Sequence, residues 1–394
     1  MKYLKLVFIT FWMIVLSSCS STRNTNFNSK QIKNKNSKLI IGYNENLETL
    51  ALIYNLSESG EYHYNKIPGP RATLSKELTS QFESFKNHEA VTKLNKLLND
   101  GFVDMYDILL SLYNTKLPEY KQYAKYPSVY YENEGITAEE TQARFDDFNI
   151  SVIKFYKDAD LKNRFKKGYR NIYKKIAEEL QSVTPKNNII TELEDYYGVK
   201  RNEYEIIISA FSFNGIGRAI LIKNDKYSKA ACLVTSNHLL ESDSININKI
   251  EHYNLGYKDI KYFQEIGIHE LIHTFLHEIF KENEKNTLLI NELNYLFTDS
   301  LKNNMKKQGY TDWKTCFEEH LVRLGELKIA QRLGNHDFVT KYRKECIEER
   351  GFIYFELIEN LLLEYENNRI KYKNFEDFIP ELVQKIKSKT QITE

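Results

Sequence analysis

Residues 267–277 contain side chains whose types and spacing suit a zinc hydrolase. The His-Glu-x-x-His pattern occupies residues 269–273. On an α-helix, residues four apart lie about 40° apart around the axis and about 6 Å apart along it, so two imidazoles can hold one ion. We therefore expect His269 and His273 to be zinc ligands and Glu270 to be the general base.

The chemistry of such a site explains why these residue types are needed. Zinc in a hydrolase keeps three protein ligands and one open position for a water molecule, whose pKa the metal lowers to roughly 7. Glu270 would take the proton of that water and then act as proton donor. The pattern predicts a zinc metallopeptidase that hydrolyses peptide bonds with a zinc-activated water, with Zn²⁺ as cofactor and a peptide or protein as substrate.

The apolar residues around the pattern predict which side of the helix faces the core. At about 100° per residue, four of them fall within roughly 60° of Ile268, namely Leu271, Ile272, Phe275 and Ile279. His269, Glu270 and His273 fall roughly 100° to 200° from Ile268. The ligands and the base should therefore face whatever covers the other side of the helix.

The third ligand must come from outside the pattern. A metzincin would need glycine at position 276 and histidine at position 279, but the chain has Leu276 and Ile279, so that class is disfavoured. His277 continues the four-residue series, yet a straight helix cannot wrap three successive turns around one tetrahedral ion. We expect His277 to support the site from outside the ligand set or to lie at the surface.

A glutamate on a later helix, as in gluzincins, is the remaining option, and two compete. Glu292 follows an asparagine, as in thermolysin-like sequences. Glu319 stands one turn before Arg323, whose guanidinium could orient the ligating carboxylate. The residues alone leave both open, since exposed helices contain many such glutamates.

A small sheet is expected just before the metal-binding helix. Short apolar, β-branched runs that are typical of strands occupy residues 188–191, 205–209, 218–222 and 230–234. In thermolysin-like folds such a sheet packs against the helix with the His-Glu-x-x-His pattern, and its edge strand pairs with extended substrate. We predict an α+β fold that is predominantly helical and zincin-like.

The rest of the chain reads as helical after a first strand at residues 38–43. Helical spacing of apolar residues marks segments 46–57, 73–85, 90–98, 105–113, 161–183, 288–305, 312–333, 337–349, 352–367 and 375–386. Pro185 should end one of these helices. We predict an N-terminal helical region at 39–185 and a zincin-like metallopeptidase region at 186–390, unless the two form one continuous domain.

The N-terminus has the features of a lipoprotein signal peptide over residues 1–19. Lys2 and Lys5 precede an apolar segment that is too short to span a membrane, and the tetrad Leu-Ser-Ser-Cys ends at Cys19. Such a tetrad resembles a bacterial lipobox, so Cys19 should carry lipid and anchor the protein to a membrane. A plain secretory signal is the alternative, and it also predicts export.

Residues 20–38 should be a flexible tether, because they are mostly Ser, Thr, Asn and Lys with almost nothing apolar. Ser20 and Ser21 follow Cys19 without an aspartate, which resembles sorting to the outer membrane. No acidic run follows Cys19, so we expect the protein to face the periplasm, with the cell surface as the alternative.

Charge and cysteine content limit other partners. Lys and Arg number 55 against 54 Asp and Glu, a formal net charge of +1, so we expect no nucleic-acid partner. Cys232, Cys316 and Cys346 are odd in number and far apart, which predicts neither a disulfide framework nor a second metal site. One bridge between Cys316 and Cys346 would be possible.

Several stretches resemble an uncharacterised family of bacterial secreted proteins, labelled only as a domain of unknown function and similar to gluzincin-type zinc metallopeptidases. They are residues 45–50, residues 85–91, and Tyr310 and Trp313 leading into residues 319–323. The resemblance extends from about Ile40 to Leu333. It favours Glu319 over Glu292 as the third ligand, with Arg323 beside it. Leu324 departs from the family pattern, which has a small residue there.

The oxyanion-stabilising residue is not assigned by the sequence. His320 or Tyr310 could supply it, but His320 falls near the apolar stripe of its helix and is better explained as a core histidine. The alternative to an enzyme is a lipid-anchored binding or scaffold protein that keeps the zincin fold without turnover.

Overall fold

The computed structural model describes residues 39–66, 73–99, 108–109, 112–113, 115–116, 121–122, 137–184, 189–212, 217–224, 227–236, 245–281 and 283–391. The predicted signal peptide with Cys19, the predicted tether at 20–38 and most of the predicted helix at 105–113 lie outside these residues. Among the described residues, no helix combines the length and the apolar character that crossing a membrane requires.

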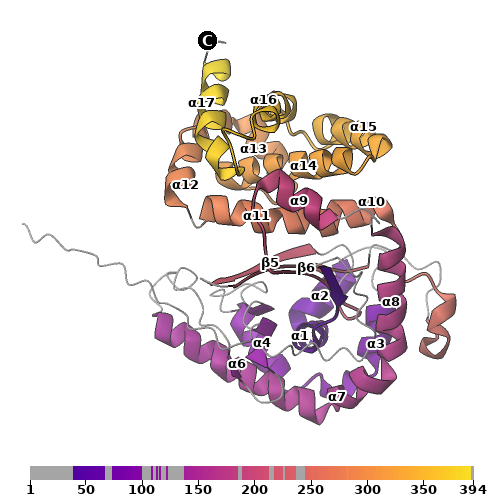
Figure 1. Cartoon of the computed structure of the whole chain (residues 1–394). Coiled ribbons are helices and arrows are strands. Elements are labelled where there is room, and N and C mark those ends of the chain that lie inside the picture. The colour runs from indigo at the N-terminus through magenta and orange to yellow at the C-terminus, as the bar shows by residue number, and fades with distance from the viewer. Residues whose placement is uncertain are drawn as a thin grey trace, which may run out of the picture.

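A four-stranded mixed sheet lies between two groups of helices (Figure 1). Its strand order is β1 (Leu39–Gly42), β4 (Glu203–Ile208), β6 (Tyr227–Val234) and β5 (Gly217–Asn224). β1, β4 and β6 are parallel, and β5 runs antiparallel to β6 at one edge. A separate two-stranded ladder joins β2 (Thr115–Lys116) to β3 (Lys121–Gln122). The predicted α+β, predominantly helical fold class is confirmed.

Three strand termini lie together at one end of the sheet. Ile208 pairs with Val234, and Val234 also pairs with Gly217. The last residues of β4 and β6 and the first residue of β5 therefore lie side by side.

The first group of helices covers the lower face of the sheet in Figure 1. It contains α1 (Glu45–Asn55), α2 (Glu58–Lys66), α3 (Thr73–Ser80), α4 (Glu89–Asn99), α6 (Ala138–Asp158) and α7 (Leu161–Asn163), with α8 (Arg170–Val183) standing beside the sheet. Helix α6 was not predicted from the sequence. The helix predicted at 161–183 is divided by a π-helical turn, Arg164–Gly168.

The second group covers the upper face and begins with a helix where a strand was expected. Residues 188–191 were predicted to be a strand, but Ile189–Tyr197 forms helix α9, so that prediction is wrong. The β-branched residues at its start fit either structure. Packing decides the outcome, because Ile189, Leu193 and Tyr197 follow helical spacing and are buried.

The rest of the upper group includes the helix with the His-Glu-x-x-His segment, α11, and the helices that follow it in the chain (Figure 1). The helices of this part are α10 (Ile260–Phe263), α11 (His269–Lys281), α12 (Glu284–Asn291), α13 (Asp299–Lys306), α14 (Trp313–Arg332), α15 (His336–Lys344), α16 (Phe355–Asn367) and α17 (Ile379–Thr390). α11 contacts β5 and β6 on one side and α14 on the other. The expected packing of the sheet against this helix is present.

Both predicted regions contribute to one hydrophobic core, which runs from Leu39 to Ile386. β1 from the first region also pairs with β4 from the second. Cys232, Cys316 and Cys346 are buried free thiols, so the bridge between Cys316 and Cys346 is not formed.

Candidate metal centre

The helix that carries the His-Glu-x-x-His pattern has the orientation that its apolar residues predict. Ile268, Leu271 and Ile272 have no exposed surface, and Phe275 and Ile279 are also buried. A π-helical turn, Gln264–Ile268, immediately precedes α11. His269 and His273 lie on the side of α11 that faces α14, next to Ile272 of the apolar stripe, which lies close to Gly325 of α14.

α14 is an internal helix rather than a solvated one. Asp312 caps it by accepting a hydrogen bond from the backbone N–H of Thr315 at 2.9 Å. Every residue from Cys316 to Ala330 is buried. Buried carboxylates are costly unless they are paired or bind a metal, so Glu318, Glu319 and Glu326 need partners.

Those partners include the two histidines of α11. His269 Nε2 and His273 Nε2 lie 3.1 Å apart. Glu319 Oε1 lies 3.2 Å from His273 Nε2, and Glu319 Oε2 lies 3.9 Å from His269 Nε2. His269, His273 and Glu319 each offer one ligand atom, all within 4.8 Å of one another, and the group could hold a metal ion.

The protonation of these groups suits a cation. Burial lowers the pKa of His269, so its imidazole is neutral. Burial would raise the pKa of Glu319, but the hydrogen bond to His273 and the nearby charges lower it to about 2. Burial also opposes the charged form of His273, yet hydrogen bonds to Glu318 and Glu319 raise its pKa to about 10. A metal would replace that proton, since only neutral imidazole can ligate.

The three candidate ligands are of the types that bind zinc. Glu319 Oε2 is buried and accepts no hydrogen bond in the described part of the chain. A buried carboxylate oxygen without a hydrogen-bond donor destabilises the fold unless a bound ion or a water molecule contacts it. Two imidazole nitrogens and one carboxylate oxygen are the ligand types of catalytic zinc sites, so zinc fits these residues.

Each histidine is held from behind by its own carboxylate on α14. His269 Nδ1 lies 2.6 Å from Glu326 Oε1, and His273 Nδ1 lies 3.3 Å from Glu318 Oε1. This arrangement fixes the orientation of each imidazole and leaves its Nε2 for a metal. These roles of Glu318 and Glu326 were not predicted from the sequence. Glu326 lies two helical turns after Glu319, and this spacing on one helix face could have revealed it.

Arg323 supports the glutamate behind His269 more closely than it supports Glu319. Its Nη1 donates to Glu326 Oε1 at 3.0 Å, whereas its Nε lies 3.9 Å from Glu319 Oε2. Tyr342 of α15 donates to Glu326 Oε2 at 2.8 Å. Nothing in the sequence signals Tyr342, because only the tertiary structure brings α15 to this site.

Glu292 lies elsewhere. It caps the C-terminus of α12, its side chain is 44% exposed, and it forms an ion pair with Lys387. Of the two glutamates that the residues left open, only Glu319 belongs to the cluster.

Glu270 lies where the sheet meets α11. Gly217, the first residue of β5, touches it so closely that a Cβ added there would be 2.4 Å from Glu270 Oε1. Only glycine fits at this position without a shift of the carboxylate. Burial raises the pKa of Glu270 to about 7, although His273 and Arg218 act in the opposite direction. Such a pKa suits a group that takes and returns a proton near neutral pH.

The structure also places His277, His320 and Tyr310. His277 is half-buried on α11, outside the cluster. His320 is fully buried, its Nδ1 lies 2.8 Å from the carbonyl oxygen of Cys316, and burial lowers its pKa to about 4. Tyr310 accepts a hydrogen bond from Arg323 at 3.5 Å, and burial and Glu319 raise its pKa to about 12. Tyr310 therefore keeps its proton beside the cluster.

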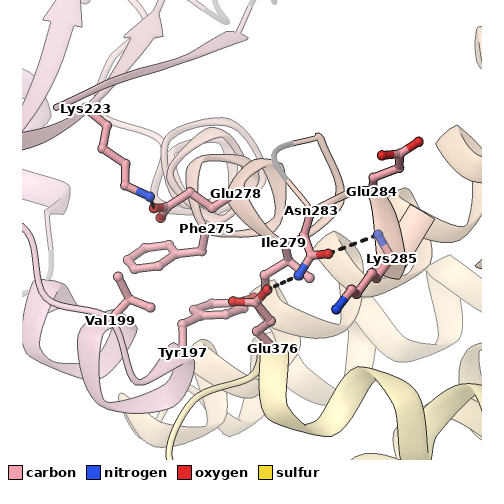
Figure 2. Close-up of a pocket in the computed structure, with 10 residues that line it drawn as sticks. All are labelled: Tyr197, Val199, Lys223, Phe275, Glu278, Ile279, Asn283, Glu284, Lys285 and Glu376. Carbon is pink, nitrogen blue, oxygen red and sulfur yellow. Dashed lines mark hydrogen bonds and ion pairs between the residues drawn. The ribbon is translucent and has the colours of Figure 1, made fainter. Parts of the chain in front are cut away.

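A pocket of about 590 Å³ lies at the C-terminal end of α11, and Figure 2 shows its lining residues. Phe275, Glu278 and Ile279 contribute to it from the side of the helix opposite His273. Glu278 is paired there with Lys223 at 2.5 Å. The pocket lies apart from the ligand cluster.

Substitution of the carboxylates behind the two histidines is predicted to weaken zinc binding. Glu326→Gln is expected to weaken zinc binding by about 10- to 100-fold, because the charge behind His269 is lost. Glu318→Gln should cost less, since its contact is longer and its side chain is 12% exposed. Competition with a chromophoric chelator measures both dissociation constants.

The matched control is Glu292→Gln, which removes the same charge from a glutamate that lies outside the cluster. An unchanged affinity in Glu326→Gln, with the fold intact by circular dichroism, would contradict the supporting role.

Comparison with known proteins identifies the family of this chain. The chain belongs to a family described as a domain of unknown function, DUF4932, which matches residues 39–385. The match extends past the end expected from the sequence, Leu333, and includes α15, α16 and most of α17. No curated protein and no solved structure matches the chain.

Proposed function

We propose that this chain is a zinc metallopeptidase of the gluzincin type. The observation that carries the proposal is the convergence of His269, His273 and Glu319, with each histidine backed by a carboxylate and Glu270 beside them. Packing of α11 on a small mixed sheet, with the third candidate ligand on a later helix, supports the zincin-like part of the proposal.

His269, His273 and Glu319 would hold the zinc. When bound, the ion would lower the pKa of a water molecule and polarise the substrate carbonyl. Glu270 accepts the proton of the attacking water on its carboxylate and then gives a proton to the leaving amine. Tyr310, protonated and next to Arg323, is the better candidate to stabilise the oxyanion, because His320 is enclosed in the core.

The extended substrate would pair with β5. Within the described residues, the outer edge of β5 pairs with no other strand. Because Gly217 of β5 touches Glu270, a peptide bound along this edge would bring a main-chain carbonyl close to the base. Membrane anchoring through a lipid on Cys19, with the protein facing the periplasm, is part of the same proposal and has its support in the N-terminal sequence alone.

A direct test uses protein purified without chelator. We expect about one zinc per chain and cleavage of an unfolded protein substrate, and we expect cleavage to stop after chelation and return with added zinc. Elemental analysis and mass spectrometry of the products are the measurements. Bound zinc without hydrolysis of any peptide would favour a binding or scaffold protein. Absence of zinc would contradict the proposal of a metallopeptidase.

A further inference from the structure

We propose that Arg218, the second residue of β5, binds a carboxylate of the peptide substrate close to the scissile bond. The proposal rests on the peptidase function above and adds the substrate class. The carboxylate could come from an acidic side chain or from the C-terminus of the peptide, and the experiment below separates these sources.

Arg218 has a defined place beside the centre. It follows Gly217, which touches Glu270, and its Nη1 donates to the carbonyl oxygen of Gly217 at 2.7 Å. The guanidinium therefore lies against the residue that borders the base. Its charge is also among those that act on Glu270.

Arg218 is an exposed residue, and its side chain has no carboxylate partner in the described part of the chain. Other cations near the centre are paired. Arg323 contacts Glu326 at 3.0 Å, and Arg350 contacts Glu265 at 3.0 Å. On the same strand, Lys223 is paired with Glu278 at 2.5 Å. Arg218 thus offers a charge that no carboxylate in the described part of the chain neutralises, and N–H donors beyond the one that binds Gly217.

The strand geometry indicates what would meet this charge. Neighbouring strands align side chains at the same register on the same face, and opposite charges directly across stabilise the pair. Gly217 and Lys223 face Glu270 and Glu278 of α11, so Arg218, which alternates with them, lies on the other face of the sheet. A peptide paired with the outer edge of β5 would place one side chain opposite Arg218 on that face, next to the residue opposite Gly217. Guanidinium binds carboxylate through two parallel hydrogen bonds, so an acidic group is the best match.

The position of Arg218 at the start of the edge strand would also set a register for the peptide. A single arginine at the start of the edge strand would admit a carboxylate at one register and leave other registers disfavoured.

The experiment compares fluorogenic peptides that differ only at the positions flanking the cleaved bond. Each position carries Glu, Gln or Lys, and every peptide is made with a free and with an amidated C-terminus. Both kcat/KM with the zinc-loaded enzyme and the dissociation constant with the zinc-loaded Glu270→Gln protein are measured. The second readout is binding, so it does not depend on turnover.

We expect one position at which Glu is preferred over Gln by about tenfold or more, the size of a charge-assisted hydrogen bond. Arg218→Ala should remove this preference, and Arg218→Glu should shift it toward Lys. Lys223→Ala is the matched control on the same strand, since its charge is already neutralised by Glu278, and it should leave the preference unchanged.

The outcomes separate the two proposals. A preference that depends on Arg218 and persists in amidated peptides assigns the carboxylate to a side chain, and one that needs the free terminus assigns it to the peptide's end. Cleavage without any dependence on Arg218 overturns this inference and leaves the peptidase standing. Binding that depends on Arg218, without turnover in the wild-type enzyme, contradicts the peptidase but supports the carboxylate site. If the protein neither binds nor cleaves any of the peptides, both proposals are overturned.

Discussion

Glu270→Gln is expected to lower kcat by about 10²- to 10⁴-fold while the bound zinc is retained. The reason is that glutamine keeps the size of the side chain but cannot take a proton, and proton transfer by a positioned group contributes about that much to the rate. Glu270 is not part of the ligand cluster, so metal affinity should change little. The measurements are steady-state cleavage of an unfolded protein and zinc content of the same sample.

The same variant has a useful structural control. Glutamine is nearly isosteric with glutamate and should pass Gly217 as closely as the native side chain does, so the fold should be kept. Thermal unfolding checks this. Hydrolysis that persists at the wild-type rate in Glu270→Gln, with zinc bound, would show that another group takes the proton.

Glu319→Ala should weaken zinc binding by more than 100-fold, because it removes one of three candidate ligands rather than a supporting contact. The consequence for stability follows from mass action. Zinc at a thousand times its dissociation constant stabilises the folded chain by about 4 kcal/mol, and a 100-fold weaker site would lose about 2.7 kcal/mol of that.

The measurement for this variant is the shift in melting temperature on adding zinc, not the melting temperature itself. Glu319 also contacts His273, so its loss can change the stability of the metal-free protein. Glu292→Ala removes the other candidate glutamate and should keep the full zinc-dependent shift, because Glu292 is paired with Lys387 at the surface. A normal zinc shift in Glu319→Ala would remove Glu319 from the ligand set.

The sequence predicted correctly those features of the candidate site that depend on the geometry of a single helix. The spacing of His269, Glu270 and His273, and the buried stripe from Ile268 to Ile279, require only helical geometry. The strands near the site were also found by their β-branched runs. The helix at Ile189–Tyr197 was mistaken for a strand because a short apolar run fits both structures until its packing partners are known.

The centre itself needed the tertiary structure. The sequence places Glu319 and Glu292 on helices but does not say which helix is internal, and α14 is internal only because α9, α11, α12, α15 and α16 pack around it. The same packing brings Glu318 and Glu326 behind the histidines and Tyr342 behind Glu326. The sequence by itself determined the candidate ligand pair and the candidate base, since their spacing depends only on the geometry of one helix. The third candidate ligand and its supports were decided by contacts between helices far apart in the chain, which residue spacing does not encode.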